Sequence, residues 1–161
     1  MVHRGERGCY AVEINRQAPA VAEREIRIDA SPADVWKVHA DINGWHTWNP
    51  DISASKLVGE LSPGSEFNWT SGGVKITSTL QEVEDSRRIS WTGRGAGTSA
   101  RHLWTLEADG DSTILRTEES MEGWLISLMK GKAQKTLEAS LDGWLIDLKQ
   151  AVEMNHNGTS L

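Results

Sequence analysis

Alternating apolar and polar residues dominate two runs of the chain, residues 98–106 and 113–119, which flank the turn residues Asp109 and Gly110. Every second residue of each run lies on one face of an extended strand. Two such runs around a turn predict an antiparallel β-hairpin with one face toward the core. The residues predicted on that inner face are Ala100, His102, Trp104, Leu106, Thr113, Leu115, Thr117 and Glu119.

The register of this hairpin follows from the position of its turn. If Leu106 lies opposite Thr113, then Arg101 lies across from Glu118 on the outer face. An opposite-charge pair on the solvated face and aromatic–aliphatic pairs on the inner face make this register self-consistent.

A strand and two short helices are predicted before the first of these runs. Residues 25–29 alternate as a strand. Ser31 is a favourable N-cap and Pro32 suits the first position of a helix, so a helix is expected to begin there. Residues 41–44 interrupt it, and a second short helix or turn over residues 45–49 ends before a proline.

The segment from residue 52 to residue 119 alternates with period two between glycine-containing or polar turns, which predicts a meander of antiparallel strands. The apolar members of the expected cross-strand pairs all share one face, which supports the register. These pairs are Trp69 with Val74, Leu80 with Trp91, and Ile89 with His102.

Residues 127–153 predict a long final helix, because apolar residues recur there at spacings of three and four. Gly123 and Gly131 indicate a separate turn or flexible lid around Trp124. The predicted elements are a sheet of six to seven strands, two short helices after the first strand, and a long C-terminal helix. The long helix must pack on the apolar face of the sheet, which makes an α+β architecture. The apolar stripe of the helix consists of Leu137, Leu141, Trp144, Leu148 and Val152.

The 161 residues suit one domain, which is expected over residues 21–153. Residues 1–20 are polar and lack sustained periodicity, so they are expected to be a flexible leader or a loosely attached extra strand. Residues 154–161 are expected to be a disordered tail.

Composition and charge narrow the classes of partner. Eight tryptophans against one Phe and one Tyr indicate large flat apolar walls, either packed or lining a cavity. The net charge of −6, without a Lys/Arg cluster, argues against a nucleic-acid partner. A single cysteine, Cys9, fits a reducing compartment. No bilayer-spanning apolar run and no signal-peptide pattern occur, so a cytoplasmic location without integral membrane association is expected.

Motifs for metal or nucleotide chemistry are missing from the sequence. There is no HExxH motif or pair of cysteine ligands, and the five histidines are scattered, so no metal site is expected. The glycine-rich residues 93–97 precede a strand rather than a helix, which predicts a hairpin turn and not a dinucleotide loop. No cofactor is expected.

Five sequence phrases occur in the order of the predicted elements. They are ASPADVW at residues 30–36, WHTWNP at residues 45–50, RRISW at residues 87–91, RHLWTLE at residues 101–107 and TEE at residues 117–119. On these phrases, residues 21–152 resemble the polyketide cyclase/dehydrase branch of the START/Bet v 1-like (SRPBCC) superfamily. The resemblance implies a helix-grip fold, in which a curved antiparallel sheet wraps around the C-terminal helix and leaves a cavity. The superfamily includes aromatase/cyclases, lipid and hormone binders and chaperone activators, so fold alone does not select a function.

His102 and Glu119 are the candidate catalytic residues, because polar side chains on an apolar face are unexpected. An imidazole can transfer a proton near neutral pH or donate a hydrogen bond to a ligand carbonyl. A glutamate is almost never fully buried without a partner, and these two positions share one face, so a contact inside the cavity is expected. The alternatives are a core histidine satisfied by a neighbour, and a glutamate at a solvated strand end.

The candidate ligand-binding residues are inward aromatic, aliphatic and serine side chains, and ordinary core packing is the alternative for each. Trp45 and Trp48 lie near the expected mouth of the cavity, where they would act as a gate or as a plug. The full set is Trp36, Trp45, Trp48, Trp69, Ile76, Ser78, Leu80, Trp91, Trp104, Leu137, Leu141 and Trp144.

Two main functions stay open at this point. In the first, the protein binds a small hydrophobic molecule, polyketide-like or aromatic, and catalyses its cyclisation or dehydration by positioning and proton transfer. In the second, it is a non-catalytic module that binds or transports a hydrophobic ligand or lipid. A third reading, weaker, is a modulator of a partner protein that resembles the chaperone activators. The sequence is compatible with a monomer or a homodimer.

Overall fold

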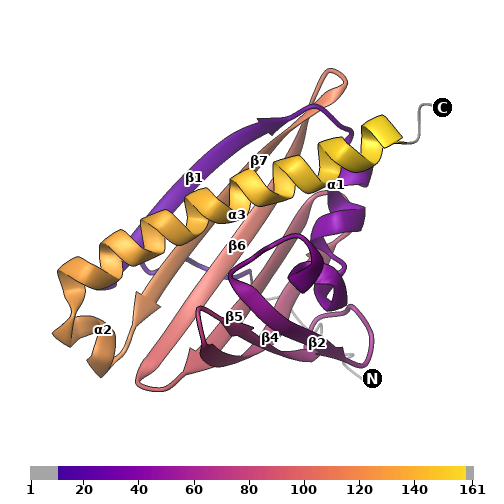
Figure 1. Ribbon diagram of the computed structural model, residues 1–161. Coiled ribbons are helices and arrows are strands. Elements are labelled where there is room, and N and C mark those ends of the chain that lie inside the picture. Colours follow the sequence, from indigo (N-terminus) through magenta and orange to yellow (C-terminus); the bar gives the residue numbers. More distant parts are fainter. Residues whose placement is uncertain (1–10, 159–161) are drawn as a thin grey trace, which may run out of the picture.

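The computed structural model describes residues 11–158 and forms one antiparallel sheet packed on a long helix (Figure 1). The strands run in the order β1-β7-β6-β5-β4-β3-β2, so β1 and β2 are the two edges. The strands are β1 (Ala20–Ile28), β2 (Ile52–Val58), β3 (Glu66–Ser71), β4 (Val74–Glu84), β5 (Arg88–Gly95), β6 (Thr98–Asp109) and β7 (Ser112–Glu122). The helices are α1 (Pro32–His39), the 3-10 helix η1 (Ile42–Thr47), α2 (Trp124–Leu128) and α3 (Lys130–Gly158).

Helix α3 crosses the concave face of the sheet, with α2 at one end and α1 at the other (Figure 1). Helix α1 begins as the sequence predicts, because the Ser31 hydroxyl accepts a hydrogen bond from the Asp34 amide at 3.2 Å. The seven-stranded curved sheet with its long C-terminal helix confirms the expected α+β helix-grip class.

The strand faces agree with the predicted alternation, but most registers differ by two residues. Leu80 pairs with Trp91 as expected. In the β6–β7 hairpin the two-residue loop is Gly110–Asp111 instead of Asp109–Gly110. Moving a turn by one residue changes the pairing by two and keeps every side chain on its face. The observed pairs that correct the expectations are Trp69 with Ile76, Trp104 with Ile89, His102 with Trp91 and with Glu119, and Arg101 with Ser120.

A bulge in β4 reverses the alternation partway along the strand. The register shifts between Leu80 and Glu82, so Glu82 pairs with Ser90 and Val83 pairs with Ile89. Val83 packs against the core on the concave face, whereas the buried Glu82 accepts a hydrogen bond from the Ser90 hydroxyl at 2.6 Å. The bulge therefore keeps this carboxylate away from the concave face.

Residues 11–19 do not behave as the expected flexible leader. The Val12 amide donates to Glu82 Oε2 at 3.2 Å, Arg101 donates to the Glu13 carbonyl at 3.0 Å, and the Asn15 amide donates to Ser120 Oγ at 3.1 Å. These contacts carry the segment across β4, β6 and β7 before it enters β1. The rest of the expected leader, residues 1–10 with Cys9, lies outside the described residues.

The C-terminal boundary also differs from the expectation. Helix α3 runs to Gly158, so residues 154–158 are helical instead of a disordered tail, and residues 159–161 lie outside the described residues. A break at Met129 separates α3 from α2, as the glycines around Trp124 indicated. Among the described residues, no helix has the length and apolar character needed to cross a bilayer.

Two apolar clusters fill the space between the sheet and α3. The larger one, the aromatic cluster, lies toward α1 and includes Trp45, Phe67, Trp91, Trp104 and Trp144. The smaller one, the aliphatic cluster, lies toward α2 and consists of Ala20, Ala22, Ile126, Leu137 and Leu141, with Met121 and Ala133 packed against it.

Candidate functional site

His102 and Glu119 meet on the concave face, as the sequence predicted. They are directly paired across β6 and β7, and His102 Nδ1 lies 3.4 Å from Glu119 Oε2. The other ring nitrogen, His102 Nε2, lies 2.8 Å from Thr117 Oγ1. The imidazole is thereby held from both sides by side chains of β7.

The aromatic cluster encloses His102. Its ring centroid lies 4.8 Å from that of Trp91 and 5.1 Å from that of Trp104, and only 3% of the side chain is exposed. Burial lowers the pKa of His102 well below its ordinary value, and the nearby His39 lowers it further. His102 is therefore neutral at physiological pH.

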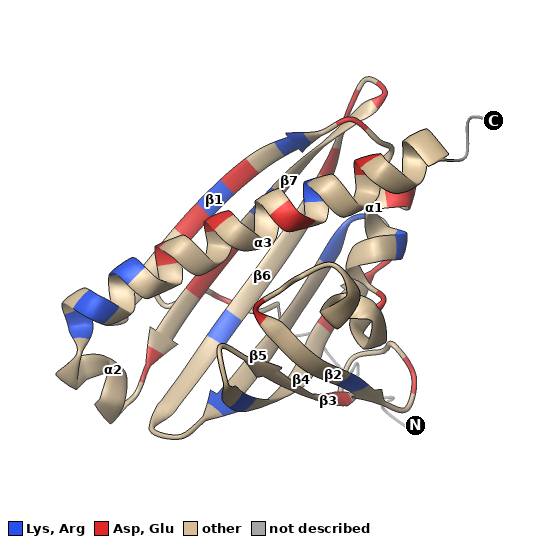
Figure 2. Ribbon diagram, viewed as in Figure 1, with Lys and Arg blue, Asp and Glu red and all other residues tan. Residues whose placement is uncertain are grey.

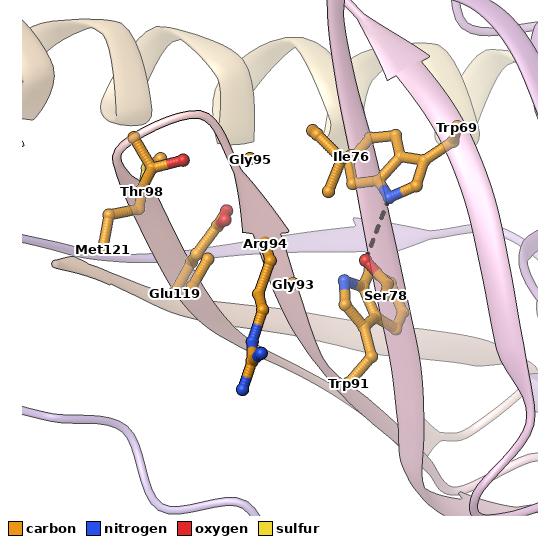
Figure 3. Close-up of a pocket in the computed structure, with 11 residues that line it drawn as sticks. Trp69, Ile76, Ser78, Trp91, Gly93, Arg94, Gly95, Thr98, Glu119 and Met121 are labelled. Carbon is orange, nitrogen blue, oxygen red and sulfur yellow. Dashed lines mark hydrogen bonds between the residues drawn. The ribbon is translucent and has the colours of Figure 1, made fainter. Parts of the chain in front are cut away.

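Glu119 is mostly buried beside the same cluster, with 15% of its side chain exposed. Desolvation raises the pKa of this carboxyl to about 8. Arg94, the one cationic side chain drawn near it, extends away from the carboxyl (Figure 3). Glu119 is thus mostly protonated at pH 7, and its contact with His102 joins two neutral groups instead of an ion pair.

A pocket of about 60 Å³ opens beside Glu119 (Figure 3). Trp69, Ile76 and Trp91 line one side and Met121 the other, while the wall between them includes the backbone of β5 and β6. Within the pocket wall, Ser78 Oγ accepts a hydrogen bond from Trp69 Nε1 at 3.0 Å. The remaining lining residues are Gly93, Arg94, Gly95, Thr98 and Ala100.

The structure separates the predicted ligand-binding residues into two groups. Trp69, Ile76, Ser78 and Trp91 line the pocket together with Glu119. The other candidates pack in the two clusters instead, so most of the tryptophans fill the concave face and do not line an open cavity. These packed residues are Trp36, Trp45, Trp48, Leu80, Trp104, Leu137, Leu141 and Trp144.

Sequence reasoning missed His39, the last residue of α1. It is fully buried, and neither ring nitrogen has a hydrogen-bond partner. Its ring lies 4.4 Å from that of Trp104, and burial lowers the pKa of His39 to about 3. The signal was present, because His39 follows the apolar Val35 by four residues and so shares its helix face.

This arrangement can donate a proton or a hydrogen bond into an apolar pocket. The protonated Glu119 carboxyl is a donor at neutral pH, whereas the carboxylate formed above pH 8 only accepts. Neutral His102 can accept a hydrogen bond at Nδ1 when Nε2 carries the proton and donates to Thr117. No group of three His, Cys, Asp or Glu side chains suited to a metal ion occurs among residues 11–158.

Solved structures with the same fold span nearly the whole domain. TTHA0849 from Thermus thermophilus has 16% identity and a TM-score of 0.74, covering 84% of this chain and 98% of that chain. A START superfamily protein from Mycobacterium smegmatis has 14% identity and a TM-score of 0.67, covering 83% and 97%. A STAR-related lipid transfer protein from Xanthomonas axonopodis has 21% identity and a TM-score of 0.63, covering 86% and 89%. At such low identities the likeness shows the fold alone.

No curated protein matches the chain significantly in sequence. Residues 19–153, which span β1 to most of α3, match the family described as polyketide cyclase/dehydrase and lipid transport. Because this match covers the sheet, the pocket and most of the helix, the chain belongs to the family described as polyketide cyclase/dehydrase and lipid transport.

Proposed function

We propose that the protein binds a small hydrophobic molecule whose carbonyl group accepts a hydrogen bond from Glu119. The observation that carries this proposal is the position of the mostly buried Glu119 carboxyl, whose pKa burial raises to about 8, at the wall of an apolar pocket. An apolar pocket with one well-placed polar group is the usual form of a small-molecule site. The membership in a family described by polyketide cyclisation and lipid transport supports the same ligand class.

Pocket size limits what the observed conformation accepts. A volume of about 60 Å³ admits a small group, while the pockets that hold drug-sized ligands enclose roughly 300–1,000 Å³. A larger ligand must therefore displace part of the wall. Met121 is the wall residue best suited to move, because its unbranched thioether side chain adopts many conformations at small cost.

Proton transfer from Glu119 is the catalytic step that the same geometry favours. The carboxyl O–H polarises a bound carbonyl and transfers its proton as negative charge develops on the carbonyl oxygen. An enol carbon of the same molecule attacks this ketone and forms the new carbon–carbon bond, while the ketone oxygen keeps the Glu119 proton as a hydroxyl. The enol returns its own O–H proton to the Glu119 carboxylate as its carbonyl re-forms. For dehydration, the restored carboxyl protonates the new hydroxyl, which leaves as water, and the resulting carboxylate takes the proton from the neighbouring carbon. The same contacts without turnover constitute a binding module, and only a reaction assay separates the two.

Calorimetric titration with a matched pair of ligands tests the proposal. Acetophenone and ethylbenzene have similar size, but only acetophenone has a carbonyl oxygen. We expect the protein to bind acetophenone more tightly at pH 6, and this preference to disappear above pH 8 because the carboxylate cannot donate.

Three variants locate the effect. Glu119→Gln keeps an N–H donor and should retain the carbonyl preference at every pH, whereas Glu119→Leu should lose the preference. The exposed Glu107→Gln on β6 is the matched control and should behave as wild type. Equal affinities for the two ligands at pH 6, or a carbonyl preference that persists in Glu119→Leu, would show that Glu119 does not bind the carbonyl.

A further inference from the structure

The short helix α2 presents apolar side chains to solvent at one end of the molecule. Trp124 is 69% exposed, Leu128 is 76% exposed and the adjoining Met129 is 40% exposed. Single exposed apolar residues are ordinary, but three large ones grouped on six consecutive positions indicate an interaction surface. We call Trp124, Leu128 and Met129, with the lysines described below, the α2 surface.

The fold fixes the outward orientation of these side chains. Ile126 points inward and is buried in the aliphatic cluster with Leu137 and Leu141. The Leu125 amide donates to the Gly97 carbonyl at 3.2 Å, which attaches α2 to the β5–β6 turn. A Cβ atom on Gly97 would lie 2.7 Å from the Trp124 indole, so that ring rests directly on the turn. The α2 surface is therefore anchored on its inner side and open on its outer side.

The α2 surface is also basic, although the protein as a whole is acidic. Lys130, Lys132 and Lys135 are exposed, and none of them forms an ion pair within residues 11–158. Residues 123–137 contain no Asp or Glu, although the whole chain has a net charge of −6. Figure 2 shows the lysines in blue at the start of α3, next to uncharged α2, and the acidic positions of α3 farther along the helix.

The acidic residues on either side of this segment have partners of their own. Glu122 accepts a hydrogen bond from the Asn15 side chain at 3.1 Å, and Glu138 accepts one from Gln134 at 2.9 Å. The three ammonium groups are thus left to solvent or to an external anion.

We propose that the α2 surface docks on an anionic lipid bilayer. An indole, an aliphatic and a thioether side chain flanked by lysines match the interfacial zone of a membrane, where apolar groups enter the acyl boundary and ammonium groups reach the phosphates. Lysines near an anionic membrane each add to the attraction, and the acid-free segment lets them act together. The same membrane repels the rest of the protein, which is acidic. The protein should therefore approach the membrane with its α2 end first.

The α2 surface lies beside the pocket, and this part of the inference rests on the proposed function. Gly97, which contacts Trp124, is in the same turn as Gly95 and Thr98, which line the pocket. Met121, another lining residue, comes three positions before Trp124 in the chain. A docked molecule would therefore hold its pocket next to the bilayer, so that a hydrophobic ligand reaches Glu119 without crossing bulk water.

Co-sedimentation with vesicles of phosphatidylcholine, with and without phosphatidylglycerol, tests the docking. We expect binding only to the anionic vesicles, weakening as salt screens the lysines. Neutralising Lys130, Lys132 and Lys135 to Gln should lower the partition coefficient roughly fivefold per lysine. Trp124→Ser with Leu128→Ser should lower it at least as far.

Matched control variants distinguish binding through the α2 surface from non-specific hydrophobic or electrostatic binding. Ile146→Ser with Met154→Ser removes two exposed apolar side chains of α3 away from α2, and Lys37→Gln, Lys56→Gln and Lys75→Gln remove three other lysines. Both control variants should bind as wild type. Equal loss in the controls, or no binding of the wild type to anionic vesicles, would overturn the proposal.

Two further measurements distinguish membrane docking from dimerisation and from ligand binding. If sedimentation velocity shows a dimer that Trp124→Ser with Leu128→Ser dissociates, the α2 surface joins two copies of the chain and the lipid proposal fails. Acetophenone binding without vesicles should be unchanged in every α2 variant, because none of these side chains touches the pocket. If docking on vesicles fails, the proposed ligand site is unaffected. If acetophenone does not bind, the proposed membrane docking is unaffected.

Discussion

The two halves of the space between the sheet and α3 are built differently. Toward α1, five large aromatic rings interlock with ring centroids 5.0–5.6 Å apart around Trp45. Toward α2, the buried residues are alanines, leucines and an isoleucine. The pocket lies between the two halves, with Trp69 and Trp91 of the aromatic half on one side and Met121 on the other. Large flat rings at contact distance leave no room for a ligand inside the aromatic half, whereas the flexible Met121 can move.

The buried polar groups differ between the two halves in the same way. His39, in the aromatic half, packs against Trp104 but has no exposure and no hydrogen-bond partner for either ring nitrogen, so burying these polar atoms costs stability. Glu119, at the border, keeps 15% of its side chain open toward the pocket. The aromatic half is thus densely packed, whereas the candidate site lies where this packing ends.

Removing one ring from the aromatic half should produce the largest effect. Trp45 is fully buried, and its Nε1 donates to the His39 carbonyl at 2.8 Å. We expect Trp45→Ala to lower the free energy of unfolding by roughly 3–5 kcal/mol, measured by urea denaturation. Met121→Ala at the pocket should cost far less and should enlarge the site. Similar losses for both variants would show that the two halves contribute equally to stability.

Glu119→Gln should reveal the raised pKa as a stability change. Between its ordinary pKa of 4.5 and about 8, the unfolded state has released a proton that the native state keeps. Wild-type stability from this group therefore falls as pH rises through that window, by up to about 1.4 kcal/mol per pH unit. The variant should gain stability relative to wild type, reaching about 3 kcal/mol at pH 7 and nothing at pH 4. A constant difference across these pH values would mean that Glu119 is ionised in the native protein.

His39→Leu tests the opposite sign in the other half. Burial lowers the pKa of His39 from 6.5 to about 3. Between these pH values, His39 is protonated in the unfolded state but neutral in the native state. Wild-type stability from this group is full above pH 6.5 and falls on acidification. The variant should resist acid better, with a relative gain of about 2 kcal/mol at pH 5 compared with pH 7. His102 is also buried and its pKa is also lowered, so the variant should keep part of the acid sensitivity of the wild type. If variant and wild type lose stability equally on acidification, the pKa of His39 is not lowered by burial.

Much of this arrangement was accessible from the sequence, because side-chain alternation depends only on strand geometry. The inward faces of β6 and β7, and hence the meeting of His102 with Glu119, followed from period two. The register did not, because moving the turn to Gly110–Asp111 changes no face and leaves no trace in the pattern.

The filling of the concave face was also beyond the sequence. Whether Trp45, Trp104 and Trp144 pack together or surround a cavity depends on distances between β-strands and helices that are remote in the chain. The bulge near Glu82 was hidden for a similar reason, since its reversal of the alternation shows only when β4 and β5 are paired.

The smallest effect should come from Gly93→Ala, which narrows the pocket without touching the aromatic half. A Cβ atom at Gly93 would lie 3.1 Å from Ser78 Oγ and 3.4 Å from Ile76 Cγ2, both lining atoms. We expect the variant to bind acetophenone several-fold more weakly, with a change in unfolding free energy within about 1 kcal/mol. Gly143→Ala is the matched control, because a Cβ there meets nothing and alanine favours a helix, so it should raise stability slightly and leave binding unchanged. Undiminished binding by Gly93→Ala would place the ligand outside this pocket, since a methyl group takes up a substantial share of so small a volume.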